Sequence, residues 1–356
     1  MIAVVLVGGE GTRLRPLTLD EPKPVLPIGG VPFASLMLDR LAAAGVSRVI
    51  LSCGYLPERL AAGIGEPPPG VEVEVVVEDE PLGTAGAIAY AARGRVDGPY
   101  LALNGDVLGD ADLGALVSTH RDTGARATIL LTPVDDPTRY GVVVTDPDGA
   151  VERFVEKPPT ADGLGPAPWW VNAGAYVLDP DVLADVPEDR MTSIEREVFP
   201  DLVGCGLRAH RSQGYWRDIG TLESFLAANA DAVGGRVHTR LGGADGAVLV
   251  DPAASVDSDA RLVGPVRICA GARVAAGAEI GPDAVIGPDA IVEAGARVRG
   301  AVLLGGAAVG PDARVEGSAV GRDARIGAGA ELAGSALGTG AEVAAGERLA
   351  DDRRPG

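Results

Sequence analysis

From residue 271 the sequence repeats in units of six residues, GARVAA, GAEIGP, DAVIGP, DAIVEA and GARVRG. In each unit the fourth place holds Val or Ile, the second holds Ala, and the first holds Gly or Asp. A spacing of six fits neither the helical period of 3.6 nor the strand alternation of two. It predicts short strands joined by tight corners, with one branched aliphatic side chain of each unit pointing inward.

The same step runs from Val250 to Leu304 and continues to Leu349 with three steps shortened to five residues. Small Ala residues are expected because successive coils stack about 4.8 Å apart. The pattern resembles the hexapeptide-repeat left-handed parallel β-helix, and its length predicts between five and six coils. Acyltransferases with such repeats use a His, but none follows His238, so we expect a structural or regulatory tail.

The composition changes at the start of this tail. No aromatic residue follows Phe225, and 22 of the 51 Gly lie in the last 116 residues. Residues 1–240 and 241–356 are therefore predicted to be separate domains, and every candidate for chemistry lies in the first.

Several classes of protein are excluded by charge and hydropathy. A net charge of −19 would repel a nucleic-acid backbone. The apolar runs are too short to span a membrane, and the first residues lack a basic leader. The three cysteines have no zinc-site spacing and suit a reducing compartment, so we expect a cytoplasmic protein; they are Cys53, Cys205 and Cys269.

The first 240 residues alternate strand-like and helical segments, which predicts an α/β domain with a mostly parallel, Rossmann-like sheet. Ligands of such sheets bind at the carboxyl ends of the strands. The predicted strands are Ile2–Val7, Val49–Ser52, Val73–Val77, Tyr100–Leu103 and Ala127–Leu131. The predicted helices are Pro32–Ala44, Thr84–Ala92 and Leu113–His120.

The first strand leads into Gly8-Gly9-Glu10-Gly11-Thr12-Arg13. Glycines allow the backbone N–H groups to approach an anion, and Arg13 adds a planar fork for phosphate oxygens. A plain glycine turn would give the same pattern. The phosphate-site interpretation is favoured by Glu21-Pro22-Lys23-Pro24, where two prolines stiffen the backbone around Lys23.

Lysine is rare in this chain. Of the 31 basic residues only Lys23 and Lys157 are Lys, and the other 29 are Arg. Both lysines lie next to prolines, so each could belong to a solvated ion-pair turn. Their rarity instead indicates positions that need a compact ammonium group.

Together these motifs resemble the signature of the nucleoside-diphosphate-sugar pyrophosphorylases, or sugar-1-phosphate nucleotidyltransferases. The resemblance covers nearly the whole chain, because the family often carries a hexapeptide-repeat tail. Further matching segments are Glu80-Pro81-Leu82-Gly83-Thr84, Asn104-Gly105-Asp106, Tyr140-Gly141, Glu156-Lys157-Pro158, Asn172-Ala173-Gly174 and Trp216-Arg217-Asp218-Ile219-Gly220.

Two segments most resemble the GDP-mannose pyrophosphorylases: residues 192–200 and Gly214–Gly220. The first has a structural alternative, because Thr192 and Glu195 have capping-box spacing and Pro200 would end a helix. Asn104-Gly105-Asp106 departs from the family's Asn-Ser-Asp but keeps the acid.

The resemblance implies transfer of a nucleotidyl group from a nucleoside triphosphate to a sugar 1-phosphate, with Mg²⁺ as cofactor. Its catalytic residues would be Arg13, Lys23 and Asp106. Asp106 and Asp218 would hold the metal. The nucleotide would contact Leu6, Gly8, Gly9, Gly11, Thr12, Arg13, Lys23, Glu80, Gly83 and Thr84. The sugar phosphate would contact Gly141, Glu156, Lys157 and Asn172.

GTP and mannose 1-phosphate are the expected substrates. Pyrimidine-using relatives place a Gln where this chain reads Glu78-Asp79-Glu80, and a carboxylate could accept the N–H donors of guanine. Two alternatives stay open: a glucose-1-phosphate thymidylyl- or uridylyltransferase, and a non-catalytic homologue that senses nucleotide sugars. The β-helix is expected to join copies of the chain into a homo-oligomer.

Overall fold

The computed structural model describes residues 1–95, 97–188 and 190–356. Contacts divide the chain into two compact units, each described below by itself. Unit 1 comprises Met1–Gly9, Met37–Ala61 and Gly65–Trp216, and unit 2 comprises Glu10–Leu36, Ala62–Ile64 and Arg217–Gly356. Residues 10–36 thus belong to the same unit as the repeats, which their place in the chain does not suggest.

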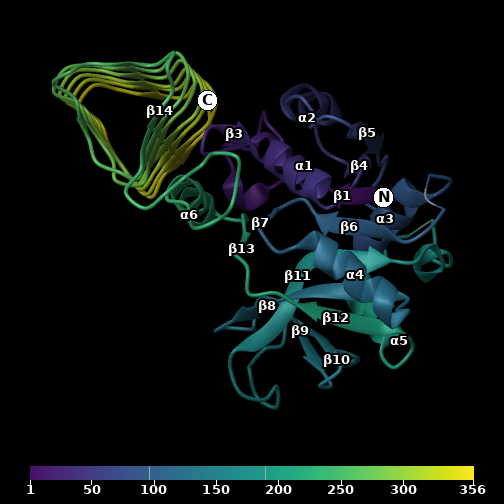
Figure 1. Cartoon of the computed structure of the whole chain (residues 1–356). Coiled ribbons are helices and arrows are strands. Elements are labelled where there is room, and N and C mark those ends of the chain that lie inside the picture. Colours follow the sequence, from purple (N-terminus) through teal and green to yellow (C-terminus); the bar gives the residue numbers. More distant parts are fainter. Residues whose placement is uncertain (96, 189) are drawn as a thin grey trace. The chain divides into compact units, whose positions relative to one another are not determined.

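A mixed sheet forms the centre of unit 1, and its parallel part contains four of the predicted strands (Figure 1). β1 (Ile2–Leu6) lies between β4 (Arg48–Cys53) and β6 (Tyr100–Asn104), and β5 (Glu72–Val77) pairs with β4. The apolar side chains of β1, β4 and β6 are mostly buried on both faces, as expected for parallel strands covered by helices, whereas β5 is partly exposed. The carboxyl ends of β1 and β6 are neighbours, because Leu6 pairs with Asn104.

The second part of the sheet is antiparallel and extends it on the side of β6. β11 (Trp169–Leu178) pairs with β6, β8 (Ala127–Val134) and β9 (Gly141–Thr145), all antiparallel. β10 (Val151–Glu156) pairs with β9, and β12 (Leu207–Arg211) runs parallel to β8. The predicted fold class is confirmed, with an antiparallel extension that the strand–helix alternation did not indicate.

The helix α4 (Leu113–Thr123) begins and ends where the sequence offers caps. It begins at Asp112, which accepts a hydrogen bond from the Ala115 amide at 3.0 Å, and ends at Gly124 with φ 60°. The other α-helices are α1 (Phe33–Ala43), α2 (Pro57–Gly63), α3 (Gly83–Ala92), α5 (Phe199–Leu202) and α6 (Leu222–Val233). The predicted helices α1, α3 and α4 are confirmed.

Short elements link these parts. Four are two- or three-residue strands: β2 (Pro27–Ile28), β3 (Val31–Pro32), β7 (Val107–Gly109) and β13 (Trp216–Asp218). Four are single helical turns: η1 (Thr12–Leu14), η2 (Lys23–Val25), η3 (Pro180–Leu183) and η4 (Ile194–Val198).

The segment 192–200 departs from its expected capping. Ser193, and not Thr192, caps η4 by accepting from the Arg196 amide. Pro200 lies in the first turn of α5 instead of ending a helix, where its missing N–H costs nothing. The capping-box prediction for Thr192 and Glu195 was therefore wrong.

The repeats form three parallel sheets, drawn green to yellow in Figure 1 and consistent with the predicted left-handed β-helix. The first sheet has seven strands: β14 (Val248–Val250), β17 (Val266–Ile268), β20 (Ala284–Ile286), β23 (Val302–Leu303), β26 (Ala319–Val320), β29 (Ala336–Leu337) and β32 (Arg353–Arg354). The second has six: β15 (Ser255–Val256), β18 (Arg273–Val274), β21 (Ile291–Val292), β24 (Ala308–Val309), β27 (Arg325–Ile326) and β30 (Glu342–Val343). The third also has six: β16 (Arg261–Leu262), β19 (Glu279–Ile280), β22 (Arg297–Arg299), β25 (Arg314–Glu316), β28 (Glu331–Ala333) and β31 (Arg348–Ala350).

The register explains the shortened steps. Ile286 pairs with Leu303, which pairs with Val320, so Leu303 is the inward residue and not the expected Leu304. The first short step therefore falls at the corner marked by Gly300, with φ 54°.

The first place of each hexad is Gly or Asp because the backbone there is left-handed. Asp289, Gly306 and Asp323 have φ of 57°, 70° and 56°. A Cβ added to Gly306 would collide with the stacked carboxylate of Asp323, and in this column of corners Gly and Asp alternate from coil to coil.

One outer face of the solenoid is apolar and covered within unit 2. Val285, Val302 and Ala319 point away from the solenoid core, yet each is at most 1% exposed. α6 contacts β17 and β20, and Pro16 approaches Gly338. No helix among the described residues is long and apolar enough to cross a bilayer.

Candidate active site

The signature loop in unit 2 is held by short-range contacts. Gly11 has φ 60°, and its carbonyl accepts a hydrogen bond from the Thr18 hydroxyl at 2.9 Å. A Cβ on Gly11 would lie 3.5 Å from the Cβ of Lys23, so the base of the Lys23 side chain lies next to this turn. Thr12 and Arg13 follow in η1. The loop therefore brings two predicted phosphate-binding cations to one short stretch of backbone.

Arg13 lies against Gly220 in unit 2. Its Nη2 would be 2.6 Å and its Cζ 3.0 Å from a Cβ placed on Gly220, so a larger residue there would displace this guanidinium. The Gly220 amide donates to the Ser224 hydroxyl at 3.0 Å. Asp218, a predicted metal ligand, precedes Gly220 by two residues in the same unit.

In unit 1 the first predicted nucleotide residues lie where β1 ends. The Leu6 carbonyl accepts from the Gly105 amide at 2.8 Å, and a Cβ on Gly105 would be 2.5 Å from that oxygen. This close approach explains Gly at the place of the family's Ser. Asp106 thus follows a turn fixed directly to the end of β1. Gly9 has open space where a side chain would stand.

Glu78 faces this same strand end. Its Oε1 accepts from the Ser52 hydroxyl at 2.7 Å and would lie 3.6 Å from a Cβ on Gly8. Its Oε2 accepts a longer bond, 3.4 Å, from the Leu82 amide. Glu80, the acid predicted to bind the nucleotide, is exposed instead.

Gly83 and Thr84 are braced by the segment 192–195. The Thr84 hydroxyl donates to Glu195 Oε2 at 2.7 Å and accepts from the Ile194 amide at 2.8 Å. Gly83 has φ 73°, and a Cβ there would be 2.6 Å from the Thr192 carbonyl oxygen. The side-chain hydroxyl of Thr84 therefore holds the loop in place, which leaves its backbone to face a nucleotide.

Three of the predicted sugar-phosphate residues lie together. A Cβ on Gly141 would be 2.9 Å from Glu156 Oε2, and Lys157 Nζ is 3.3 Å from Glu156 Oε1. The Glu156 side chain is 17% exposed and that of Lys157 59%, so the carboxylate is sheltered and the ammonium faces solvent. Lys157 has φ 46°, a conformation that costs energy in a non-glycine residue and is found at functional sites.

Asn172 is held in one orientation by two hydrogen bonds. Its Oδ1 accepts from the Gly174 amide and its Nδ2 donates to the Tyr176 hydroxyl, both at 2.9 Å. These two bonds use one N–H of the Asn172 side chain, so its second N–H can donate to a substrate.

Tyr176 is a site residue that the sequence motifs missed. It is fully buried, and burial raises its pKa well above the usual value, helped by the charges of Glu195, Glu156 and Asp106. The hydroxyl therefore stays protonated among three acids. A tyrosine in an otherwise apolar strand, four residues after Asn172, is the signal that could have indicated it.

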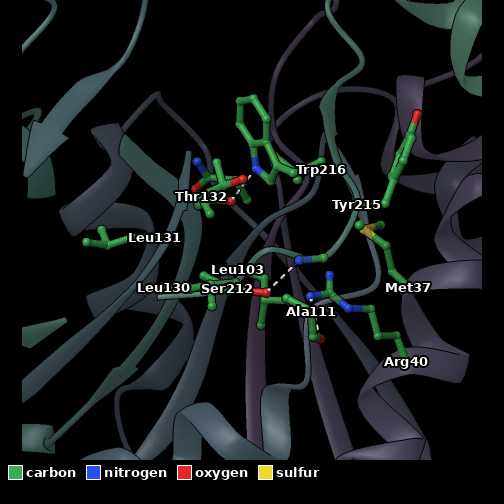
Figure 2. Close-up of a pocket in the computed structure, with 17 residues that line it drawn as sticks. Met37, Arg40, Leu103, Ala111, Leu130, Leu131, Thr132, Ser212, Tyr215 and Trp216 are labelled. Carbon is green, nitrogen blue, oxygen red and sulfur yellow. Dashed lines mark hydrogen bonds between the residues drawn. The ribbon is translucent and has the colours of Figure 1, made fainter. Parts of the chain in front are cut away.

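Asn104 is one of the residues that line a small cavity in unit 1 (Figure 2). Figure 2 shows Arg40 reaching from α1 to the Ala111 carbonyl, a bond of 3.1 Å, and Trp216 on another side of the lining. Burial lowers the pKa of Arg40 to about 10, so its guanidinium stays charged at neutral pH. A volume near 20 Å³ holds about one water molecule, so no substrate binds in this cavity.

A larger hollow of about 520 Å³ lies along the loop that carries Glu78 and Glu80. Its opposite wall is formed by α3 and residues 186–188 and 190–191, including exposed Tyr90 and Met191. The volume falls in the range of small-molecule pockets.

The donor atoms fit a magnesium ion held mainly by substrate. Asp106 in unit 1 and Asp218 in unit 2 are the two carboxylates predicted to hold it, and the described residues contain no cluster of three or more potential protein ligands. Mg²⁺ is commonly bound by one or two carboxylates together with phosphates and water.

Comparison with family models gives two matches. A model described as nucleotidyl transferase matches residues 2–234. A second, described as GMPPB C-terminal domain, matches residues 262–351.

Curated relatives carry one activity in their names. A mannose-1-phosphate guanylyltransferase of Mycobacterium tuberculosis is 44% identical over 240 residues, 65% of each chain. A mannose-1-phosphate guanyltransferase of Aspergillus fumigatus is 42% identical over 64% of this chain and 62% of its own. The chain thus matches slightly less than two thirds of the length of these relatives.

Among solved structures, HddC from Yersinia pseudotuberculosis complexed with GMP-PN is 31% identical, with a TM-score of 0.55. The match covers 65% of this chain and 99% of the Yersinia chain.

Proposed function

Because the chain belongs to the nucleotidyl transferase family, we propose that it transfers the guanylyl group of GTP to mannose 1-phosphate. The products are GDP-mannose and pyrophosphate. The observation that carries this proposal is the approach of the Arg13 guanidinium to Gly220, two residues after a predicted metal ligand. The names of the relatives support the choice of substrates.

Arg13 and Lys23 bind the β- and γ-phosphates of GTP in this proposal. Arg13 offers a bidentate guanidinium and Lys23 a point charge. The backbone N–H groups of Gly8, Gly9, Gly11 and Thr12 add donors where the glycines let the chain approach. Local groups must attract the nucleotide, because the net charge of −19 repels it at long range.

Asp106 and Asp218 hold Mg²⁺, which neutralises charge on the phosphates. The carboxylate of Asp106 follows a turn fixed to β1, and that of Asp218 stands two residues before the Arg13 contact. Both acids therefore come from backbone that is restrained by other contacts, as positioning for phosphoryl transfer requires.

Glu78 selects guanine through its carboxylate, which can accept from N1–H and the 2-amino group. Its position facing Gly8 supports this role. Glu80 borders the nucleotide from the exposed side, and the backbone of Leu6, Gly83 and Thr84 completes the base site.

The sugar phosphate lies between β9, β10 and β11. Gly141, Glu156 and the remaining Asn172 N–H bind its hydroxyls, and Lys157 binds its phosphate. Tyr176 keeps Asn172 in place through its protonated hydroxyl.

In the reaction, a phosphate oxygen of mannose 1-phosphate attacks the α-phosphorus of GTP. The new P–O bond forms as the bond between the α-phosphorus and the bridging oxygen breaks, and pyrophosphate leaves with the electron pair. Arg13 and Lys23 stabilise the charge that grows on this leaving group.

The proposed setting is the cytoplasm, and the proposed partners are the two substrates and further copies of the chain joined through the solenoid. Neither a nucleic acid nor a membrane is required. A chain of this charge would repel the phosphates of both surfaces.

A pyrophosphate-release assay tests the function. Purified protein is given GTP, ATP, UTP, CTP or dTTP with the 1-phosphate of mannose, glucose or N-acetylglucosamine. GTP with mannose 1-phosphate should give the highest kcat/KM. A clear preference for dTTP or UTP with glucose 1-phosphate would establish the pyrimidine alternative. Absence of turnover with every pair, but binding of GDP-mannose, would make the chain a sensor.

A further inference from the structure

The solenoid contacts the phosphate loop through one arginine in a column of small residues. The corner positions Ala270, Pro288, Gly305, Arg322 and Thr339 stack through successive backbone hydrogen bonds, such as Asp323 N–H to the Gly305 carbonyl at 3.0 Å. Arg322 is the one long side chain among these five. Gly305 leaves room for it, because a Cβ there would be 2.9 Å from Arg322 Nη1.

Arg322 reaches the signature loop. Its Nε donates to Glu21 Oε1 at 2.7 Å, between residues 301 positions apart in the chain. The Glu21 side chain is 15% exposed and that of Arg322 is 49% exposed. The second oxygen of Glu21 is buried without a hydrogen-bond partner among the described residues, so this carboxylate depends on the guanidinium.

Glu21 is rigidly connected to Lys23. Pro22 fixes the backbone between them at φ −66° and precedes the turn η2. Within that turn the Val25 amide donates to the Pro22 carbonyl at 2.9 Å, and the Leu26 amide to the Lys23 carbonyl at 3.1 Å. A displacement of Glu21 therefore displaces the Lys23 backbone as well.

A second contact holds the loop from the next coil. A Cβ on Gly338 would lie 3.2 Å from the Cβ of Pro16. This contact is apolar and orients nothing, whereas the ion pair is directional and acts two residues from a predicted catalytic cation.

We propose that Arg322 is a positioning residue for Lys23: its ion pair with Glu21 sets where the ammonium meets the triphosphate. The proposal rests on the nucleotidyl transfer proposed above. It makes the solenoid part of the catalytic apparatus through one side chain, beyond any structural or oligomeric role.

The test compares Arg322→Gln with Arg325→Gln, an exposed arginine three residues further on that serves as the matched control. Arg322→Gln should raise KM for GTP roughly three- to sixfold, since a half-exposed ion pair is modest in strength. Neither KM for mannose 1-phosphate nor the melting temperature should change beyond the control. Glu21→Gln should give the same increase, and the double variant should be no worse than either single one.

Hydrogen–deuterium exchange provides a readout that does not need turnover. Peptides containing the Val25 and Leu26 amides should exchange faster in Arg322→Gln than in Arg325→Gln. Faster exchange without any nucleotidyl transfer would mean that the anchor exists and the proposed function is wrong. Turnover with unchanged KM for GTP, or with unchanged exchange of these peptides, would overturn the positioning role. Arg322→Lys should recover part of the KM effect.

Discussion

At the scale of single residues, the site depends on side chains that hold other side chains. Tyr176 fixes Asn172, and Thr84 fixes its own loop to Ile194 and Glu195. None of these bonds is visible in a motif, because a motif gives residue types and spacing without contact partners. The motifs nevertheless singled out both Arg13 and the segment that ends at Gly220, which approach each other in the structure.

Arg13→Ala should lower kcat/KM roughly 10- to 100-fold, because a charge-assisted hydrogen bond contributes about 1.5–3 kcal/mol. The side chain is exposed, so the fold should be retained. Steady-state pyrophosphate release measures the loss. The control is Arg15→Ala, an arginine that pairs with Glu10 at 2.6 Å and should affect activity less than about threefold. Equal effects of the two substitutions would contradict the phosphate-binding role of Arg13.

Removal of the metal should abolish transfer. Activity is expected to vanish with excess EDTA and to return on addition of Mg²⁺, because two carboxylates and two phosphorylated substrates need a divalent counter-charge. Asp106→Asn should shift the Mg²⁺ concentration needed for half-maximal activity upwards. Turnover in metal-free buffer would refute the assignment of both acids.

Glu78→Gln should reduce the preference for GTP over UTP by roughly tenfold, since it removes one charged acceptor facing the base. The ratio of the two kcat/KM values is the measurement. Glu80→Gln should change this ratio less, because Glu80 does not face Gly8. A larger change in Glu80→Gln would mean that Glu80, and not Glu78, selects guanine.

At the scale of elements, the strand–helix alternation predicted the parallel strands and their helices to within a few residues. It did so because apolar strands between covering helices leave a clear pattern. The antiparallel extension was less visible. β11 joins β6, β8 and β9 through pairings distant in sequence, and no local signal specifies them. The same limit applies to η4, where Ser193 replaced the expected cap because tertiary hydrogen bonds hold the backbone of Thr192 and the carboxylate of Glu195.

A buried aspartate on α6 leads to a prediction for stability. Asp231 on this helix is 3% exposed and accepts from Arg217 Nη2 at 2.8 Å and from Arg236 Nη1 at 2.7 Å. Asp231→Asn should lower the free energy of unfolding by about 3 kcal/mol, because the buried side chain that pairs with the two arginines loses its charge. Urea denaturation measures this change. Arg236→Gln should cost much less, as Arg236 is 74% exposed. A loss below about 1 kcal/mol for Asp231→Asn would show that the two arginines are satisfied by water.

At the scale of the whole molecule, the sequence and the contacts in the structure divide the protein at different places. The change in composition predicts a boundary at residue 240. Contacts instead place residues 10–36 in the unit of the solenoid. Composition could not reveal this, because the apolar outer face of the first solenoid sheet uses the same Val and Ala as the solenoid core.

Deletion of residues 241–356 should therefore abolish transfer, although every proposed ligand precedes residue 240. The deletion removes the solenoid surface that Pro16 and α6 contact. Loss of this apolar burial costs about 25 cal/mol for each Å² re-exposed. Activity and circular dichroism of the shortened chain are the measurements. A folded shortened chain with full kcat/KM would contradict this dependence.

The ion pair between Glu21 and Arg322 also bears on synthesis, since 301 positions separate its two residues. At roughly 5–20 residues per second, the ribosome adds the arginine about 15–60 s after the glutamate. During that interval the parallel sheet of unit 1 can form from chain already made, while the phosphate loop still lacks this ion pair. A nascent chain would thus fold its sheet first and would bind the nucleotide less tightly until residue 322 has been added.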